Sequence, residues 1–252
     1  MSGEAARGRE RAGWLSRRLR EVALKGGAGL VGFGEVRDGL APELERLPRA
    51  VSLGVVLPRS ETGRKRGDVA TFRVAELEER LRDIQRELCR ELRAEGWRFL
   101  AIPPDTLRPD GRFVSRLFPL FPHKTAATCS GLGWVGKSGL LVAPGAGPRA
   151  VWASVLTDAP LDTCRTPVLQ GRCGPCRLCV DACPAGAIRD VEWRRGEPPG
   201  GRPDPVACAR QMERNLKVLG KAECLVCATV CPGGEVGATM VGERRSGREG
   251  SV

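Results

Sequence analysis

Cysteine is the residue type whose spacing in this chain most directly indicates chemistry. The 252 residues include 11 cysteines, and seven of them lie in two short runs that each end in Cys-Pro. The first run, residues 173–184, reads C-x2-C-x2-C-x3-C-P, and the second, residues 224–232, reads C-x2-C-x3-C-P. Cys208 lies between them. Three cysteines at this spacing curl the backbone so that their sulfurs converge, which suits a cubane iron–sulfur cluster whose fourth ligand comes from elsewhere.

We therefore predict two [4Fe–4S] clusters, because in two-cluster ferredoxins the cysteine before the proline ligates the other cluster. The first cysteine set is Cys173, Cys176, Cys179 and Cys231. The second cysteine set is Cys183, Cys208, Cys224 and Cys227. Zinc is the alternative, since C-x2-C pairs are common in zinc sites, but one zinc ion needs only four ligands. The remaining cysteines are predicted to be structural: Cys89, Cys129 and Cys164.

Composition and charge bound the compartment and the partners. No stretch approaches 18 uninterrupted apolar residues, and the N-terminus lacks an apolar signal region, so we expect a cytoplasmic protein with no membrane partner. In a reducing compartment, cysteines are more often metal ligands than disulfides. The net charge of +11 can steer a polyanion such as tRNA toward the surface, although ordinary solvated side chains are the simpler explanation.

Helix and strand patterns precede the cysteine runs. Residues 4–25 favour a helix that ends at two glycines, and apolar residues three or four apart over 74–92 favour a second. Strands are predicted at 29–34, 49–57, 97–102, 140–143 and 150–157, with a basic loop at 59–68. The fold class is therefore α+β. We expect a mixed α/β domain over 1–165, a ferredoxin-like two-cluster module over 166–240 and a disordered polar tail over 241–252.

A glycine-rich loop, GLGWVGKS at residues 131–138, fits both G-x-G-x-x-G and G-x-x-x-x-G-K-[ST]. Each of these phosphate-binding patterns needs a strand before the loop and a helix after it, because the helix N-terminus holds the phosphate. Here residues 123–130 favour a helix and residues 140–143 favour a strand, so the order is reversed. Nucleotide hydrolysis is not predicted, but the glycines would let the backbone approach a large flat cofactor.

Three motifs in this order resemble the epoxyqueuosine reductase family, whose cobalamin-dependent iron–sulfur proteins are similar in design to reductive dehalogenases. They are HKTAATCSGLGWVGKSGLLV at 123–142, VLTDAPL at 155–161 and the eight cysteines. The resemblance implies an α+β domain that holds cobalamin beside two [4Fe–4S] clusters, which reduce the cobalt, and a substrate that is the epoxide of a modified tRNA base. It also implies a corrinoid pocket lined by Gly131, Gly133, Trp134, Gly136 and Lys137.

The sequence departs from the family pattern at three points. The family carries an acidic residue, within a Val-Asp-Thr segment, shortly before the loop, whereas residues 115–122 read SRLFPLFP here. The chain has a single histidine instead of a histidine-rich segment, and we expect no helical repeat domain after Cys231. His123 is then the candidate general acid of ordinary type near the loop, and the alternative is a residue that merely begins a helix.

Three functions remain open at this point. The first is a cobalamin-dependent reductase that passes electrons from a donor, such as a ferredoxin or flavodoxin, through two clusters to a corrinoid and then to a substrate. The second is an electron carrier that holds no corrinoid. The third is a tRNA-binding iron–sulfur protein. Retention of the GLGWVGK loop favours the first, the missing acid favours the second, and the basic charge favours the third.

Overall fold

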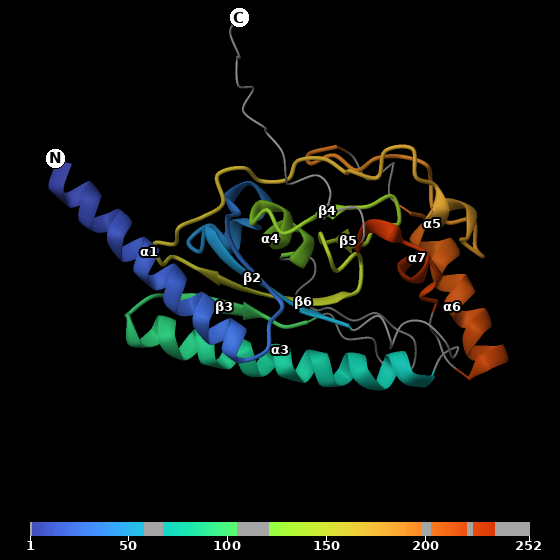
Figure 1. Cartoon of the computed structure of the whole chain (residues 1–252), viewed down its shortest axis with the longest axis horizontal. Helices are drawn as coiled ribbons and strands as arrows, with labels where there is room; N and C mark the ends of the chain where they lie inside the picture. The colour runs from blue at the N-terminus through green and yellow to red at the C-terminus, as the bar shows by residue number, and fades with distance from the viewer. Residues whose placement is uncertain (1, 58–67, 105–120, 198–202, 221–223, 235–252) are drawn as a thin grey trace, which may run out of the picture.

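The computed structural model describes residues 2–57, 68–104, 121–197, 203–220 and 224–234. At its centre is a four-stranded antiparallel sheet with the strand order β1-β2-β6-β3 (Figure 1). The strands are β1 (Leu30–Glu35), β2 (Arg49–Val56), β3 (Phe99–Ile102) and β6 (Ala150–Thr157). Each was predicted to within two residues at either end, and the mixed α/β fold class is confirmed. The antiparallel pairing is a finding that the sequence pattern did not predict.

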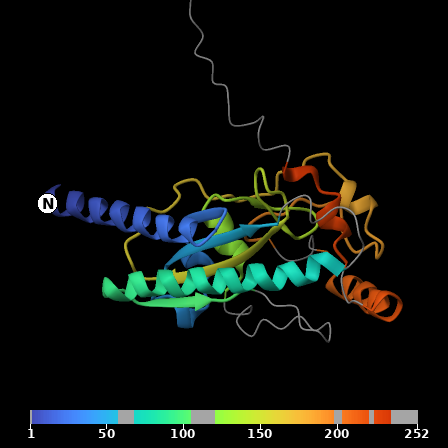
Figure 2. The same ribbon diagram turned by 60° about the horizontal axis from the view of Figure 1, so that its bottom comes forward.

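Two long helices cover one face of this sheet, α1 (Ser2–Lys25) and α3 (Asp68–Ala94) (Figures 1 and 2). Both were predicted from the spacing of their apolar residues. That spacing places one stripe of each helix in the main core, and its fully buried members are Leu15, Leu19, Leu81, Ile84, Leu88 and Leu92. Gly27 and Gly96, both with positive φ, follow the two helices as expected.

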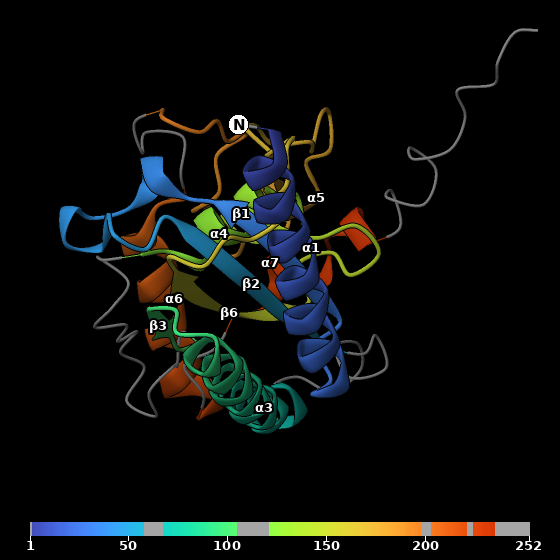
Figure 3. The ribbon, with the colours of Figure 1, turned by 90° about the vertical axis from the view of Figure 1, so that its left-hand side faces the viewer.

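The opposite face of the sheet receives the short helix α4 (His123–Cys129) (Figure 3). Strand β1 makes this possible because its sequence, LVGFGE, alternates large apolar residues with glycine. Val31 and Phe33 face the main core, whereas Gly32 and Gly34 face α4. A Cβ at Gly34 would lie 2.8 Å from the backbone carbon of Cys129, so a larger residue would push the helix off the sheet.

The cysteine-bearing segment lies at the end of the molecule away from the start of α1 (Figure 1). A small hairpin of β4 (Trp134–Val135) and β5 (Leu141–Val142) precedes it. Within it, α5 (Leu178–Asp181) and α7 (Val226–Thr229) contact each other, and α6 (Pro205–Leu219) runs alongside. Three 3-10 turns complete the described elements: η1 (Arg37–Gly39), η2 (Pro42–Leu44) and η4 (Pro232–Gly234). Only short helical pieces and α6 therefore support the cysteines.

Several predictions concern segments that the structure leaves undescribed. Most of the basic loop at 59–68, residues 115–120 of the segment that lacks the family's acid, and the tail at 241–252 lie outside the described residues. The boundary at residue 165 stays a prediction, and contacts cross it, since the N–H of Val168 donates to the carbonyl of Thr128 at 2.8 Å. Among the described helices, none combines the length and the apolar character that a membrane span requires.

Candidate functional site

The first cysteine run begins in a tight turn. The N–H of Cys176 donates to the carbonyl oxygen of Cys173 at 3.1 Å. Gly174, between them, has a φ of 54°, in the left-handed region that glycine enters without strain. Helix α5 follows, and the N–H of Cys183 reaches the carbonyl of Val180 just after it. The spacing of the motif thus becomes one turn and one short helix, which keep four thiols on a compact segment.

The structure brings Cys231, from the second run, to the first three cysteines of the first run. Burial raises the pKa of Cys179, and electrostatic repulsion from Cys173, Cys231 and Cys176 raises it further. The pKa of Cys231 is likewise raised by burial, with repulsion from Cys173 and Cys176 adding to it. These four thiols are the members of the first cysteine set, so their proximity is what that prediction requires. The assignment of the ligands themselves stays a prediction.

The second cysteine set is grouped in the same way. Burial raises the pKa of Cys227 to about 11, and Cys224, Cys208, Cys179 and Cys183 add to the increase. The pKa of Cys208 is raised by burial and then by Cys224 and Cys183. Cys179 belongs to the first cysteine set, so its influence on Cys227 means that the two sets adjoin. Clusters held by two adjoining sets of thiols would be close enough for an electron to pass between them.

The cysteines form no disulfide bonds, and the described thiols form no site for a single metal ion. All 11 cysteines are free of disulfide bonds. Among the described residues, no group of three or more His, Cys, Asp or Glu side chains is arranged to hold a single metal ion. A structural zinc ion needs four ligands at about 2.0–2.3 Å from one centre. A cubane cluster reaches each cysteine through a different iron atom, so it does not require four thiols around a single metal ion.

Lys137, from the glycine-rich loop, is directed at the first cysteine run. Its Nζ donates to the carbonyl oxygens of Gly174 at 2.6 Å and Cys176 at 3.1 Å, and it lies 2.6 Å from a carboxylate oxygen of Asp190. The hydrogen bond from Asp190 raises the pKa of Lys137, and that bond, with Arg177 adding to it, lowers the pKa of Asp190. Three acceptors satisfy the three N–H donors of this buried amine. The loop lysine therefore holds the cysteine turn rather than a phosphate.

The rest of the glycine-rich loop packs on the β4–β5 hairpin. A Cβ at Gly133 would collide with the carbonyl oxygen of Val142, and one at Gly136 would lie 3.5 Å from the Sγ of Cys173. Trp134 is buried with Val142, and Cys173 packs against the cluster that they form. A strand thus follows the loop, as expected, and no helix of the kind that a phosphate loop needs begins before α5, at Leu178. Strand β4, within the loop, was not predicted.

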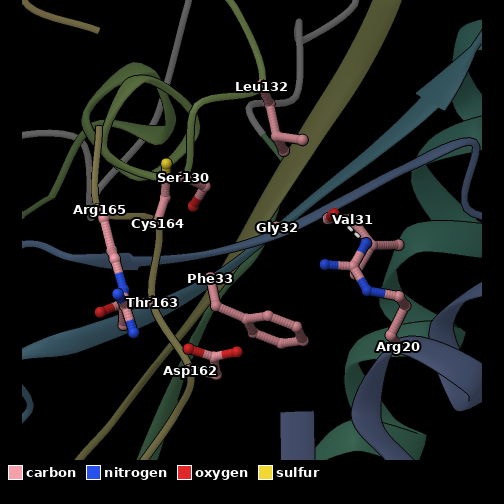
Figure 4. A pocket seen from close by; sticks show the side chains of 10 residues that line it. All are labelled: Arg20, Val31, Gly32, Phe33, Ser130, Leu132, Asp162, Thr163, Cys164 and Arg165. Atoms are coloured by element: carbon pink, nitrogen blue, oxygen red, sulfur yellow. Dashed lines mark hydrogen bonds between the residues drawn. The ribbon is translucent and has the colours of Figure 1, made fainter. Parts of the chain in front are cut away.

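A pocket of about 460 Å³ lies beside the first residue of this loop (Figure 4). Residues 31–33 of β1, residues 162–165, Arg20, Ser130 and Leu132 line it. Gly131 sits between two of the lining residues, with a φ of 72°, and a Cβ there would lie 2.9 Å from the Sγ of Cys164. The lining does not include Gly133, Trp134, Gly136 or Lys137. Of the five residues predicted to bind a corrinoid, only Gly131 is therefore next to this pocket.

His123 is buried at the start of α4 and is held from both sides. Its Nδ1 lies 2.9 Å from the hydroxyl of Ser154, and its Nε2 lies 2.9 Å from the carbonyl oxygen of Pro103. A general acid needs a ring nitrogen that can reach the substrate. These contacts favour the structural alternative, in which His123 links α4 to β6, over the catalytic role predicted from the sequence. The sequence indicated that His123 lies near the loop, but it could not show the partners Ser154 and Pro103, which the fold brings to the ring.

The other three cysteines behave largely as structural residues. Burial raises the pKa values of Cys89 and Cys129, as is usual for thiols in apolar surroundings. The N–H of Cys164 donates to the carbonyl of Phe33, while its side chain lines the pocket. Sequence reasoning missed two residues at the site. They are Asp190, which pairs with Lys137, and Arg149, which acts electrostatically on Cys231. Neither lies in a motif, so no spacing signal could have identified them.

Comparison with known proteins finds curated relatives that match part of the chain. No protein-family model matches the chain. An epoxyqueuosine reductase from Synechococcus sp. (strain CC9605) is 41% identical over 75 residues, which are 29% of this chain and 23% of that protein. Another, from Leadbetterella byssophila, is 32% identical over 120 residues, 43% of this chain and 36% of that protein. The matched segments thus span about a quarter to a third of these curated relatives.

Solved structures extend the likeness to most of the fold. An epoxyqueuosine reductase in complex with an epoxyqueuosine-modified tRNA-Tyr stem loop has a TM-score of 0.58 at 18% identity, covering 89% of this chain and 66% of that one. A reductive dehalogenase whose structure suggests a mechanism for B12-dependent dehalogenation has a TM-score of 0.68 at 18% identity, covering 90% of this chain and 34% of that one. The chain therefore has the fold of epoxyqueuosine reductases and reductive dehalogenases, and its curated homologues are epoxyqueuosine reductases.

Proposed function

We propose that this chain is an iron–sulfur oxidoreductase, similar to epoxyqueuosine reductase, that passes electrons through two [4Fe–4S] clusters to a corrinoid and then to a substrate. The observation that carries the proposal is the grouping of eight cysteines into two adjoining sets of four. The sets mix cysteines from both runs, as two-cluster modules do. Without a bound cluster, burial of these thiols would disfavour the charged thiolate, which is the form that binds metal.

The residues present fit the clusters well. The donors are thiols, and backbone N–H groups point at their sulfurs: Ala187 donates to Cys183 at 3.4 Å, and Gly233 donates to Cys231. Such bonds stabilise a metal-bound thiolate. Glycine is needed two residues after Cys231, since a Cβ at Gly233 would collide with the side chain of Val142. In this proposal the chain positions the thiols and shields them, and each cluster supplies transfer of single electrons.

The corrinoid part of the proposal rests on the pocket beside Gly131 and on the likeness to cobalamin-related neighbours. At about 460 Å³ the pocket has the size of an ordinary ligand site, so it would hold only part of a corrinoid. Gly32 is part of its wall, and Gly131 lies between the lining residues Ser130 and Leu132. When bound, a corrinoid would supply a cobalt centre able to react with the substrate. The other four loop residues would then support the first cysteine set instead of lining the pocket: Gly133, Trp134, Gly136 and Lys137.

The experiment is a joint measurement of iron and cobalt. The whole chain is purified without oxygen, reconstituted with iron and sulfide, incubated with excess hydroxocobalamin and desalted. About eight irons and about one cobalt per chain are expected, since each [4Fe–4S] cluster holds four irons. Fewer than about four irons would contradict the clusters. Full iron without cobalt would contradict the corrinoid and leave the second candidate function, an electron carrier that exchanges electrons with a ferredoxin or flavodoxin.

A tRNA substrate is a separate proposal. One neighbour of the same fold binds a tRNA stem loop, and this chain carries a net charge of +11. If tRNA is a partner, its affinity should fall steeply as salt increases, because phosphate contacts release counterions. Binding of an unmodified tRNA-Tyr stem loop at 50 and 200 mM salt measures this. Binding that does not weaken across this range would contradict an electrostatic tRNA contact.

A further inference from the structure

Two buried N–H groups near the first cysteine set have no hydrogen-bond partner among the described residues. They are the indole Nε1 of Trp134 and the guanidinium Nε of Arg149. The side chains belong to residues that are only 7% and 9% exposed. A buried donor without a partner costs about 1–3 kcal/mol, so two of them beside one site call for an acceptor.

Their positions indicate which acceptor this is. Burial raises the pKa of Cys231, and Arg149 lies close enough to oppose that increase electrostatically. Trp134 belongs to the small apolar cluster against which Cys173 and Cys231 pack. Lys137, which is 5% exposed, is also close enough to Cys173 for the thiolate to raise its pKa. All three side chains thus border the first cysteine set and come from residues before the cysteine-bearing segment.

We propose that Trp134, Lys137 and Arg149 form a donor wall that stabilises the reduced form of the first cluster and so raises its reduction potential. The proposal rests on the two clusters of the proposed function. Reduction of a [4Fe–4S] cluster adds one negative charge. Nearby cations and N–H donors to the sulfurs favour that added charge, and such hydrogen bonds are among the determinants of cluster potential.

The surroundings of the second cysteine set differ. Burial and other thiols act on Cys208 and Cys227, as they do in the first set, but no cation of the described residues appears beside these two thiols as Arg149 does beside Cys231. Cys208 is also exposed at the surface of the molecule. Among the described residues, the donor wall therefore borders the first cysteine set, so its removal should change one midpoint and leave the other unchanged.

The three members of the donor wall should not contribute equally. Asp190 lies 2.6 Å from the Nζ of Lys137 and also pairs with Arg177, so the charge of Lys137 is partly neutralised. The three N–H groups of Lys137 already have acceptors. Arg149 combines a buried charge with an unpartnered donor, and Trp134 adds an unpartnered donor alone. We expect Arg149 to have the largest effect on the potential.

The test is a redox titration of the reconstituted whole chain with dithionite, followed by EPR. The variants are Arg149→Met, Arg149→Lys, Trp134→Phe and Lys137→Met, with Arg90→Met as control, since Arg90 is an exposed arginine of α3 that pairs with Glu87. Arg149→Met should make one of the two midpoints more negative. We expect a tenfold smaller ratio of reduced to oxidised cluster at fixed potential, equivalent to 59 mV for one electron. Arg149→Lys, which keeps the positive charge, should show a smaller shift of the midpoint than Arg149→Met.

The outcomes separate this inference from the proposed function. A wild-type chain that does not bind about eight irons contradicts the two clusters and, with them, the donor wall. A wild-type chain with full iron, whose midpoints stay unchanged in both Arg149→Met and Trp134→Phe, overturns the donor wall and leaves the clusters intact. If Lys137→Met loses iron, the decision rests on the other two variants, which remove no contact to the cysteine backbone. A shift of both midpoints by Arg90→Met would also overturn the inference.

Discussion

The side-chain amine of Lys137 lies 2.6 Å from the carbonyl oxygen of Gly174, 37 residues further along the chain. The same amine reaches the carbonyl of Cys176 and the carboxylate of Asp190. A glycine-rich loop and a cysteine turn that are separate motifs in the sequence are therefore one unit in the fold. The lysine links the α/β part of the chain to the segment that would hold the first cluster.

Replacing Lys137 should weaken that unit. Lys137→Met removes the charged donor of the carbonyls of Gly174 and Cys176, and the loss of hydrogen bonds from a charged group costs about 2 kcal/mol in total. We expect the free energy of unfolding to fall by this amount and iron to be released faster to a chelator. Anaerobic urea unfolding and the rate of iron release measure the two effects. Lys25→Met, on the exposed end of α1, is the matched control and should change neither.

Gln85 makes a second long-range link, from α3 to the sheet. Its side-chain amide donates to the carbonyls of Ile102 at 2.7 Å and Ser154 at 2.8 Å, and the residue is 4% exposed. Gln85→Leu should reduce the free energy of unfolding by about 2 kcal/mol, because two buried acceptors lose their partner. Gln85→Glu should cost more, since a carboxylate cannot donate to either carbonyl. Urea unfolding checks both, and a Leu variant as stable as the wild type would contradict this account.

The sequence predicted well wherever periodicity carried the information. The apolar stripe over 74–92 became the buried face of α3, although the side chain of Val74 lies outside the described residues. The strand at 150–157 was predicted to the residue. Strand β4 was missed because two residues within a glycine-rich loop carry no periodicity, and their pairing depends on Val142 and Leu141 across a turn. The antiparallel order could not be predicted, since it depends on contacts between distant strands.

At the site, spacing predicted which cysteines lie together but not what surrounds them. The two motifs contain seven of the eight, because the ligand geometry of a cluster dictates the local spacing, and Cys208 was added because it lies between them. Lys137 was noticed for a phosphate pattern and turned out to hold the cysteine turn. His123 was noticed because it is near the loop, and its partners Ser154 and Pro103 became visible only in the fold. Roles that depend on tertiary partners leave no signal in one sequence.

The ion pair between Arg18 and Glu91 should make a small contribution to stability that depends on pH. The hydrogen bond from Arg18, at 2.7 Å, lowers the pKa of Glu91 below its usual value. A lowered folded-state pKa means that the contribution is present above the unfolded-state pKa, about 4.3, and is lost as the pH falls through the folded-state pKa. The pair is partly exposed, so we expect less than about 1 kcal/mol.

Comparison of the wild type with Glu91→Gln isolates this effect, because loss of clusters in acid is common to both chains. The difference in the free energy of unfolding, measured by urea at steps from pH 7 to pH 3, should shrink toward zero at the acid end. High salt should reduce it at neutral pH. A difference that grows as the pH falls would have the wrong sign for a carboxylate with a lowered pKa.

Replacing single cysteines tests the two sets. Cys208→Ser and Cys183→Ser should each remove the second cluster and leave about four irons per chain, because each removes one of its four thiolate ligands. Cys89→Ser, a change in the half-buried thiol of α3, should retain about eight. Iron and sulfide analysis with EPR of the reduced chains gives the count.

Cys183→Ser also tests whether the sets cross between the two runs. If Cys183 belongs with Cys208, the cluster that remains in this variant is held by Cys176, and adding Cys176→Ser should remove it and leave almost no iron. If each run held its own cluster, both substitutions would affect the same cluster, and about four irons would remain. The crossed arrangement is expected because Cys231 interacts with Cys173 and Cys176.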